Sequence, residues 1–210
     1  RLNKAEEKIA VVGGGLVGSL FSLYLAQRGH DVSVFERRSD PRKAGFIGGR
    51  SINLALSDRG WKALEMVNMA EAVKKMALPM KGRMMHAKNG TTTFQPYGKE
   101  GQAIYSVSRG GLNKLLLEAA DEHKDVSLHF DHQCKQLDLK TNRATFAVGE
   151  KKEVLQFDRI IGTDGAFSAV RSRLMKTERF NYSQKYLTHG YKELVIPAKE
   201  DGTHRLDPEA

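Results

Sequence analysis

The sequence contains a single cysteine, Cys134, among its 210 residues. One thiol can form neither an intramolecular disulfide nor a cysteine-built metal site, and it fits a protein of a reducing compartment. The seven histidines show neither HxxxH nor HExxH spacing, which are the patterns of common metal sites. No apolar run approaches the roughly 18 residues of a membrane span. We therefore expect no metal site, no membrane segment in this chain and a cytoplasmic protein.

The chain has no nucleic-acid-binding signature, although its formal net charge is +9. Its basic residues are mixed with acids, and the few basic runs, such as Lys151-Lys152, are short. Neither a helix-turn-helix nor an RNA-binding motif accompanies them. Hydrophobic residues make up 40% of the chain and charged residues 28%, as in an ordinary soluble globular protein. We expect no nucleic-acid partner.

The stretch from Lys8 to Glu36 begins with a short apolar run that suits a buried parallel strand. Gly13, Gly15 and Gly18 follow at GxGxxG spacing and lead into a helical apolar pattern, after which Asp31–Phe35 reads as a second strand. The first glycine permits a tight turn, the second lets the backbone approach a pyrophosphate, and the third lets the helix pack closely. The helix N-terminus adds free N–H groups and a positive dipole end. The stretch therefore predicts a dinucleotide-binding unit.

Glu36 ends the second strand about 20 residues beyond the loop, where an acid binds a ribose hydroxyl. An acid at this position disfavours a ribose 2′-phosphate, so the residues favour FAD or NAD over NADP and leave the choice between those two open. Arg37 and Arg38 follow directly and are placed to contact phosphate or ribose.

The segment 82–95 reads as two strands joined by Asn-Gly at 89–90, the preferred pair for a type I′ hairpin. In that register Arg83 lies opposite Pro96. Side-chain alternation then puts Arg83 and Tyr97 on opposite faces, unless the strand breaks at Pro96. The pattern leaves both arrangements open.

Two further charged residues stand at the ends of expected elements. Arg109 begins a helix predicted over 109–123, an unfavourable place for a cation, so it is either an anion ligand or a solvated surface residue. Asp164 follows an apolar strand at 159–162 and precedes a glycine turn, which suits a ligand at the carboxyl edge of an open sheet. Between them, residues 126–157 read as four successive strands.

The GGGLVG loop with Glu36, together with GTDGAFSAVR at 162–171, resembles the FAD-dependent aromatic hydroxylases of the p-hydroxybenzoate hydroxylase fold. Within that group, four segments are similar to the kynurenine 3-monooxygenase family: GRSINLALSDRG (49–60), GRMMHA (82–87), YSVSR (105–109) and YLTHGYKELVIP (186–197). The resemblance covers residues 8–197. It implies an α/β fold: a Rossmann-like FAD-binding domain of the GR2 type with inserted β-strands and the start of a β-sheet substrate domain.

The resemblance also implies a domain division. Residues 1–180 would form the FAD-binding domain, with 82–107 contributing to the substrate pocket, and residues 181–210 would begin the substrate domain with a strand over Tyr186–Ile196. These hydroxylases have a further Gly-Asp flavin motif and, in some members, a C-terminal membrane anchor, neither of which occurs here. We expect the chain to be the N-terminal portion of a longer protein, and this portion alone to be inactive. Whether that protein forms a homodimer stays open.

The chemistry implied is hydroxylation of L-kynurenine to 3-hydroxykynurenine in tryptophan catabolism. In this family NADPH reduces bound FAD, O2 adds to the flavin, and the flavin C4a-hydroperoxide transfers the hydroxyl group. The protein positions the reactants and excludes water, so no catalytic side chain is expected. The alternatives are a flavin hydroxylase of another carboxylated aromatic and an NAD-dependent dehydrogenase that uses the glycine loop alone.

The site residues follow from the same resemblance. Arg83 and Tyr97 would bind the substrate carboxylate, a task for which a guanidinium fork and a phenol are suited. The implied FAD contacts are Gly13, Gly15, Val17 and Gly18 at the pyrophosphate, Glu36, Arg37 and Arg38 at the adenosine ribose, Ala55 beside the isoalloxazine, Arg109, Cys134 on the adenine side, and Asp164 in the second nucleotide motif.

Overall fold

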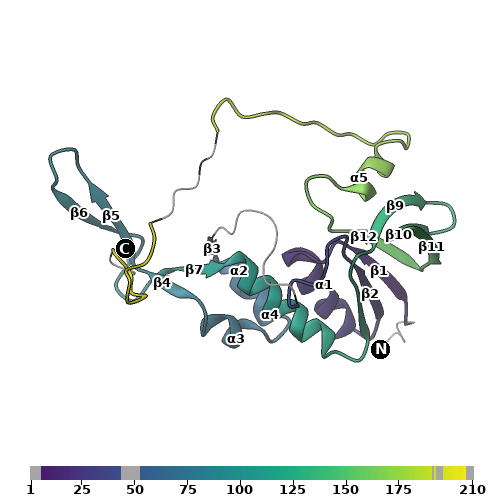
Figure 1. Cartoon of the computed structure of the whole chain (residues 1–210), viewed down its shortest axis with the longest axis horizontal. Coiled ribbons are helices and arrows are strands. Elements are labelled where there is room, and N and C mark those ends of the chain that lie inside the picture. Colours follow the sequence, from purple (N-terminus) through teal and green to yellow (C-terminus); the bar gives the residue numbers. More distant parts are fainter. Residues whose placement is uncertain (1–5, 44–52, 191, 193–195, 207–210) are drawn as a thin grey trace. The chain divides into compact units, whose positions relative to one another are not determined.

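The computed structural model describes residues 6–43, 53–190, 192 and 196–206 (Figure 1). The chain divides into two compact units. The first contains residues 1–49 and 110–184, and the second contains residues 50–109 and 185–210. The glycine loop belongs to the first unit and the predicted hairpin to the second.

The first unit is built on a parallel sheet of four strands in the order β12-β1-β2-β8. The strands are β1 (Lys8–Val12), β2 (Asp31–Phe35), β8 (Val126–His129) and β12 (Arg159–Gly162). Helix α1 (Leu16–Ala26) connects β1 to β2 and packs against both of them. Strands covered on both faces need apolar residues throughout, which explains the continuous apolar run of β1. The predicted strand–loop–helix–strand unit is confirmed.

An antiparallel sheet of three strands packs on the parallel sheet, with the order β11-β10-β9. The strands are β9 (Gln133–Asp138), β10 (Arg143–Val148) and β11 (Lys151–Gln156). The core between the sheets joins Ala10, Val12 and Phe35 to residues that include Phe146 and Val170. The rings of Phe35 and Phe146 stack with centroids 4.0 Å apart. Short helix α5 (Ala169–Leu174) lies against β9 and β12 and contributes Val170.

One predicted strand of the 126–157 series joins a different sheet. Residues 126–129 form β8, which pairs parallel with β2 rather than with β9. The reason is the preceding helix α4 (Arg109–Asp121), since a helical crossover returns the chain parallel to its neighbour. The other three strands form the antiparallel sheet as predicted.

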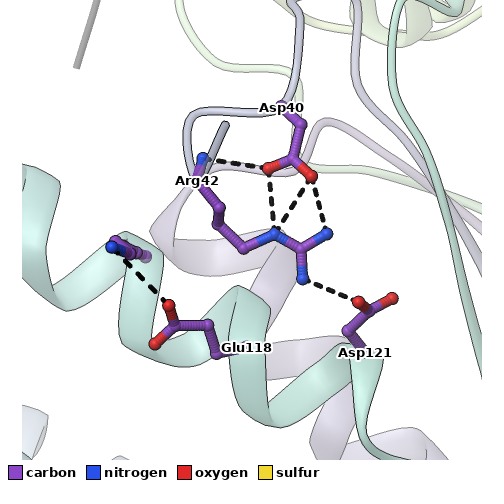
Figure 2. A network of polar contacts seen from close by, with 5 residues as sticks. Asp40, Arg42, Glu118 and Asp121 are labelled. Carbon is purple, nitrogen blue, oxygen red and sulfur yellow. Dashed lines mark hydrogen bonds and ion pairs between the residues drawn. The ribbon is translucent and has the colours of Figure 1, made fainter. Parts of the chain in front are cut away.

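A buried ion pair fixes the segment after β2 to helix α4 (Figure 2). Asp40 has 7% of its side chain exposed, and its carboxylate accepts from Arg42 Nε at 2.9 and 3.1 Å and from Arg42 Nη2 at 2.7 Å. Arg42 Nη1 donates to Asp121 on α4 at 2.8 Å. Hydrogen bonds from the Arg42 guanidinium hold the pKa of Asp40 below its ordinary value.

The second unit contains an antiparallel sheet in the order β3-β7-β4 and a separate hairpin of β5 and β6. Trp61 of α2 and Tyr105 of β7 pack edge to face with centroids 5.3 Å apart. The elements of this unit are β3 (Asn53–Leu56), α2 (Asp58–Glu65), α3 (Ala70–Lys74), β4 (Leu78–Met80), β5 (Gly82–His86), β6 (Thr92–Pro96) and β7 (Ile104–Ser108).

The hairpin has a different register from the predicted one. The N–H of Gly90 donates to the carbonyl of Ala87 at 3.0 Å, and that of Ala87 donates to Thr91 at 2.9 Å. Gly90 has φ +84°, whereas Asn89 has a negative φ. This is a three-residue loop closed by a left-handed glycine, and the predicted two-residue type I′ turn is wrong. The extra loop residue shifts the pairing by one, so Arg83 lies opposite Gln95.

The segment 181–206 contains no strand among its described residues. The predicted strand over Tyr186–Ile196 is therefore wrong for residues 186–190, 192 and 196, while its other residues lie outside the described part of the chain, as do residues 49–52 of the GRSINLALSDRG segment. A strand needs a neighbour to accept its backbone hydrogen bonds, and none pairs with this segment within the described residues. No helix in the described part of the chain has both the length and the apolar composition to cross a membrane.

Candidate functional site

The three motif glycines have three different surroundings. Gly13 has φ +108°, and a Cβ there would lie 2.6 Å from the Thr163 carbonyl oxygen. A Cβ at Gly18 would overlap the carbonyl oxygen of Gly13. A Cβ at Gly15 would meet no atom within 4 Å. The first and third glycines therefore permit close packing of the strand, the loop and the helix, while the second faces open space at the N-terminus of α1.

Glu36 contacts the glycine loop directly. Its Oε2 accepts a hydrogen bond from the N–H of Gly14 at 2.9 Å, and its Oε1 accepts one from the N–H of Arg38 at 3.0 Å. Each carboxylate oxygen retains a second lone pair for a further donor, such as a ribose hydroxyl. The side chains of Arg37 and Arg38 are exposed at the same strand end. The structure thus brings Glu36 and the glycine loop together.

Asn113 of α4 also contacts this loop, and the sequence patterns did not reveal it. Its Nδ2 donates to the carbonyl of Gly14 at 3.3 Å, and its Oδ1 lies 3.4 Å from the Ser19 hydroxyl. A polar residue in an amphipathic helix resembles an ordinary surface position. Only the packing of α4 reveals its partner.

Asp164 caps helix α5. Its Oδ2 accepts from the N–H of Ala169 at 2.6 Å, and its Oδ1 accepts from the hydroxyl of Ser168 at 2.5 Å. Ser168 itself accepts from the N–H of Arg171 at 2.9 Å. These bonds satisfy N–H groups that a helix start leaves without partners. The two oxygens of Asp164 therefore fix the turn after β12.

The two nucleotide motifs meet in space although they are far apart in the sequence. The Thr163 hydroxyl donates toward the carbonyls of Gly13 at 2.8 Å and Val12 at 3.0 Å. A groove of about 630 Å³ runs beside them, and Val17 and Asp164 both line it. Val17 is 67% exposed, an unusual state for an apolar residue on the first turn of a packed helix. The first motif and the second motif thus border one groove.

Cys134 lies on β9 opposite Phe146 and is partly buried. Burial, and secondarily the nearby Asp164, raise the pKa of its thiol to about 11. The thiol is therefore protonated at neutral pH. Within the described residues, no group of three or more His, Cys, Asp or Glu side chains is arranged to hold a metal ion.

The second unit contains the other predicted site residues. The guanidinium carbon of Arg83 lies 5.5 Å from the centre of the Tyr97 ring, and both side chains are exposed. Ala55 is exposed on β3 and pairs with Ser106 of β7. Arg109 is exposed at the first position of α4. Within this unit the structure brings Arg83 and Tyr97 together.

Curated proteins resemble this chain over nearly all of its residues. A kynurenine 3-monooxygenase of Christiangramia forsetii is 46% identical over 204 residues, which are 96% of this chain and 45% of that protein. A kynurenine 3-monooxygenase of Sus scrofa is 44% identical over 95% of this chain and 42% of its own length. The chain therefore spans less than half the length of these curated relatives.

Solved structures show the same fold. The p-nitrophenol 4-monooxygenase PnpA from Pseudomonas putida DLL-E4 superposes with a TM-score of 0.67 at 21% identity, covering 80% of this chain and 43% of that one. The FAD binding domain family matches residues 6–194, a range that contains the glycine loop, Glu36 and Asp164. The chain belongs to this family of FAD-binding domains.

Proposed function

We propose that this chain is the FAD-binding portion of a flavin-dependent monooxygenase that hydroxylates L-kynurenine to 3-hydroxykynurenine with NADPH and O2. The observation that carries the proposal is the identity of 46% to a kynurenine 3-monooxygenase across 96% of the chain. An NAD-dependent dehydrogenase is a weaker alternative, because it gives no role to the Asp164 segment that borders the same groove.

The residues present fit FAD. The open space at Gly15 and the free N–H groups at the start of α1 suit the pyrophosphate, with Gly13, Val17 and Gly18 completing the cradle. Glu36 would accept a hydrogen bond from the adenosine ribose. The other proposed contacts are Arg37 and Arg38 near the adenosine, Cys134 on the adenine side, Asp164 at the second motif, Ala55 beside the isoalloxazine, and Arg109. Bound FAD would supply electron transfer and oxygen activation.

The task of the protein in this chemistry is to bind and orient. The polar loop atoms around Gly14 and Glu36 would fix the flavin nucleotide at its adenosine end. Fixing that end leaves the reacting ring to be positioned by contacts elsewhere. No acid–base side chain is assigned a step, because the hydroxyl transfer needs a correctly placed ring and a site that excludes water.

Arg83 and Tyr97 are the proposed ligands of the substrate carboxylate. An exposed guanidinium beside a phenol offers a charged donor and a neutral donor to the same anion. With these two ligands, the segment 82–107 would contribute to the substrate site. We propose that this segment belongs to an FAD-binding domain over residues 1–180 and that a separate substrate domain begins at residue 181. For the longer protein we propose a cytoplasmic location.

The test uses the complete protein that contains this chain. NADPH oxidation is measured without substrate and with kynurenine, p-hydroxybenzoate or salicylate. The proposal expects a flavin spectrum and oxidation stimulated by kynurenine above the other two acids. Stimulation by one of the other acids would assign a different carboxylated aromatic. A complete protein without bound flavin would overturn the cofactor and the reaction together.

A further inference from the structure

Three side chains from three elements meet at the glycine loop. Glu36, at the end of β2, accepts from the N–H of Gly14 at 2.9 Å. Asn113, on α4, donates to the carbonyl of Gly14 at 3.3 Å. Ser19, on α1, is fully buried, and its hydroxyl lies 3.4 Å from Asn113 Oδ1. Gly14 is thereby held at both its N–H and its carbonyl by side chains that are distant in the sequence.

The chemistry of these groups fixes the orientation of the Asn113 amide. A carbonyl oxygen can only accept, so the NH2 group of Asn113 must face Gly14. The amide oxygen then lies 3.4 Å from the Ser19 hydroxyl, whose nearer acceptor is the carbonyl of Gly15 at 3.0 Å. Rotating the amide by half a turn would place two oxygen atoms against each other at Gly14. The orientation with Nδ2 toward Gly14 is therefore the one that satisfies the Gly14 carbonyl.

The bond from Asn113 also sets the direction of the next N–H group. In a planar trans peptide the carbonyl and the N–H point in opposite directions. Because the Gly14 carbonyl points toward Asn113, the N–H of Gly15 points away from α4. Gly15 is the loop residue whose added Cβ would meet no atom within 4 Å. Asn113 thus fixes the direction of a backbone donor at the loop residue where the chain leaves room for a ligand.

We propose that Asn113 is a positioning residue for nucleotide binding: it holds the Gly14–Gly15 peptide so that the Gly15 N–H faces a bound pyrophosphate. This inference rests on the proposed binding of FAD by the same loop. Without Asn113 the peptide can rotate and the loop must be ordered by the ligand itself, which lowers affinity. The loss of affinity should concern the pyrophosphate part of the ligand and not the adenosine part.

The experiment compares Asn113→Ala and Asn113→Ser with the control Lys114→Ala in the complete apoprotein. Lys114 is the next residue of α4 and pairs at 3.8 Å with Glu118, away from the loop. The dissociation constant of FAD is measured by quenching of flavin fluorescence, and ADP and adenosine are measured as competitors. Thermal unfolding of each apoprotein reports whether the fold is retained.

We expect each Asn113 variant to weaken FAD and ADP by about fivefold to tenfold, the effect of one hydrogen bond, and to leave adenosine and the control unchanged. A loss of folded protein lowers the apparent affinities for ADP and adenosine by the same factor, so the ratio of the two affinities tests the inference even in a destabilised variant. An unchanged ratio would overturn the inference. A parent protein that binds no FAD would instead refute the proposed function on which it rests.

Discussion

Arg83 lies over Tyr97 because the β5–β6 hairpin pairs Arg83 with Gln95, and Tyr97 follows Gln95 by two residues. Residues two apart on a strand share a face. The N–H of Tyr97 also donates to the carbonyl of Lys81 at 3.0 Å, which extends the same register beyond Pro96. A regular hairpin therefore brings this cation and this phenol together, and no break at Pro96 is needed.

Replacing Arg83 tests the proposed carboxylate site. Arg83→Ala should weaken kynurenine binding by about tenfold to hundredfold, since a hydrogen bond to a charged group contributes roughly 1.5–3 kcal/mol. Arg83→Lys should restore part of the loss, because it keeps the charge without the fork. The measurement is a kynurenine titration of the flavin spectrum. Lys88→Ala, in the loop of the same hairpin, is the control, and equal losses in both variants would contradict the assignment.

Alanine substitutions at two of the motif glycines should affect different properties, FAD affinity in one case and apoprotein stability in the other. Gly15→Ala adds a Cβ to open space at a φ of −73°, which alanine tolerates. It should keep the stability of the apoprotein and weaken FAD by roughly tenfold to hundredfold, through crowding of the pyrophosphate. Gly18→Ala overlaps the Gly13 carbonyl and should destabilise the apoprotein by more than about 2 kcal/mol. Thermal unfolding and FAD titration distinguish the two, and similar behaviour of both variants would be inconsistent with this packing.

The Arg42 ion pair makes a pH-dependent contribution to stability. Arg42→Ala leaves a buried carboxylate without its partner and should lower the free energy of unfolding by about 2 kcal/mol. Asp121→Ala removes a carboxylate that is 53% exposed and should cost less than about 1 kcal/mol. Denaturant unfolding measures both, and equal costs would argue against the difference in burial.

Asp40 sets the direction of that pH dependence. Its folded pKa is lowered by Arg42, so its contribution is complete above the ordinary aspartate pKa of about 3.9 and is lost as the pH falls through the folded value. The stability difference between the parent and Asp40→Asn should therefore be full near neutral pH and shrink below about pH 4. A stability difference that stays constant across this pH range would show that the charge of Asp40 contributes nothing to the free energy of unfolding.

Cys134 should react slowly with alkylating reagents. With a thiol pKa of about 11, roughly one molecule in a thousand carries the reactive thiolate at pH 8. Labelling of the peptide that contains Cys134, followed by mass spectrometry, should rise about tenfold per pH unit. A free cysteine added to the parent solution is the control. Rapid labelling at pH 8 would contradict the burial of this side chain.

The sequence predicted those parts of the fold that depend on local patterns. Gly13, Gly15, Gly18 and Glu36 stand at fixed spacings, because one strand, one turn and one helix form their geometry. The same holds for the antiparallel strands β9 to β11, whose turns are short. Arg83 and Tyr97 were named from a family resemblance, and their contact depends on a hairpin register that one loop residue decides.

The structural features that the sequence patterns did not predict depend on tertiary packing. Asn113 reaches Gly14 only because α4 packs beside the loop, and nothing near residue 113 signals this. The strand at 126–129 reads like its successors, yet the preceding helix directs it into the parallel sheet. The segment after residue 185 has strand-like composition, but composition alone does not supply a neighbouring strand.

The most direct test of the central claim is the origin of the oxygen atom in the product. The complete protein is given FAD, NADPH and kynurenine under 18O2, and 3-hydroxykynurenine is analysed by mass spectrometry. A kynurenine hydroxylase of this kind incorporates one 18O atom into each product molecule, and omitting NADPH abolishes the product. Product formed with unlabelled oxygen, or NADPH oxidised in the presence of kynurenine without any hydroxylated product, would contradict the account.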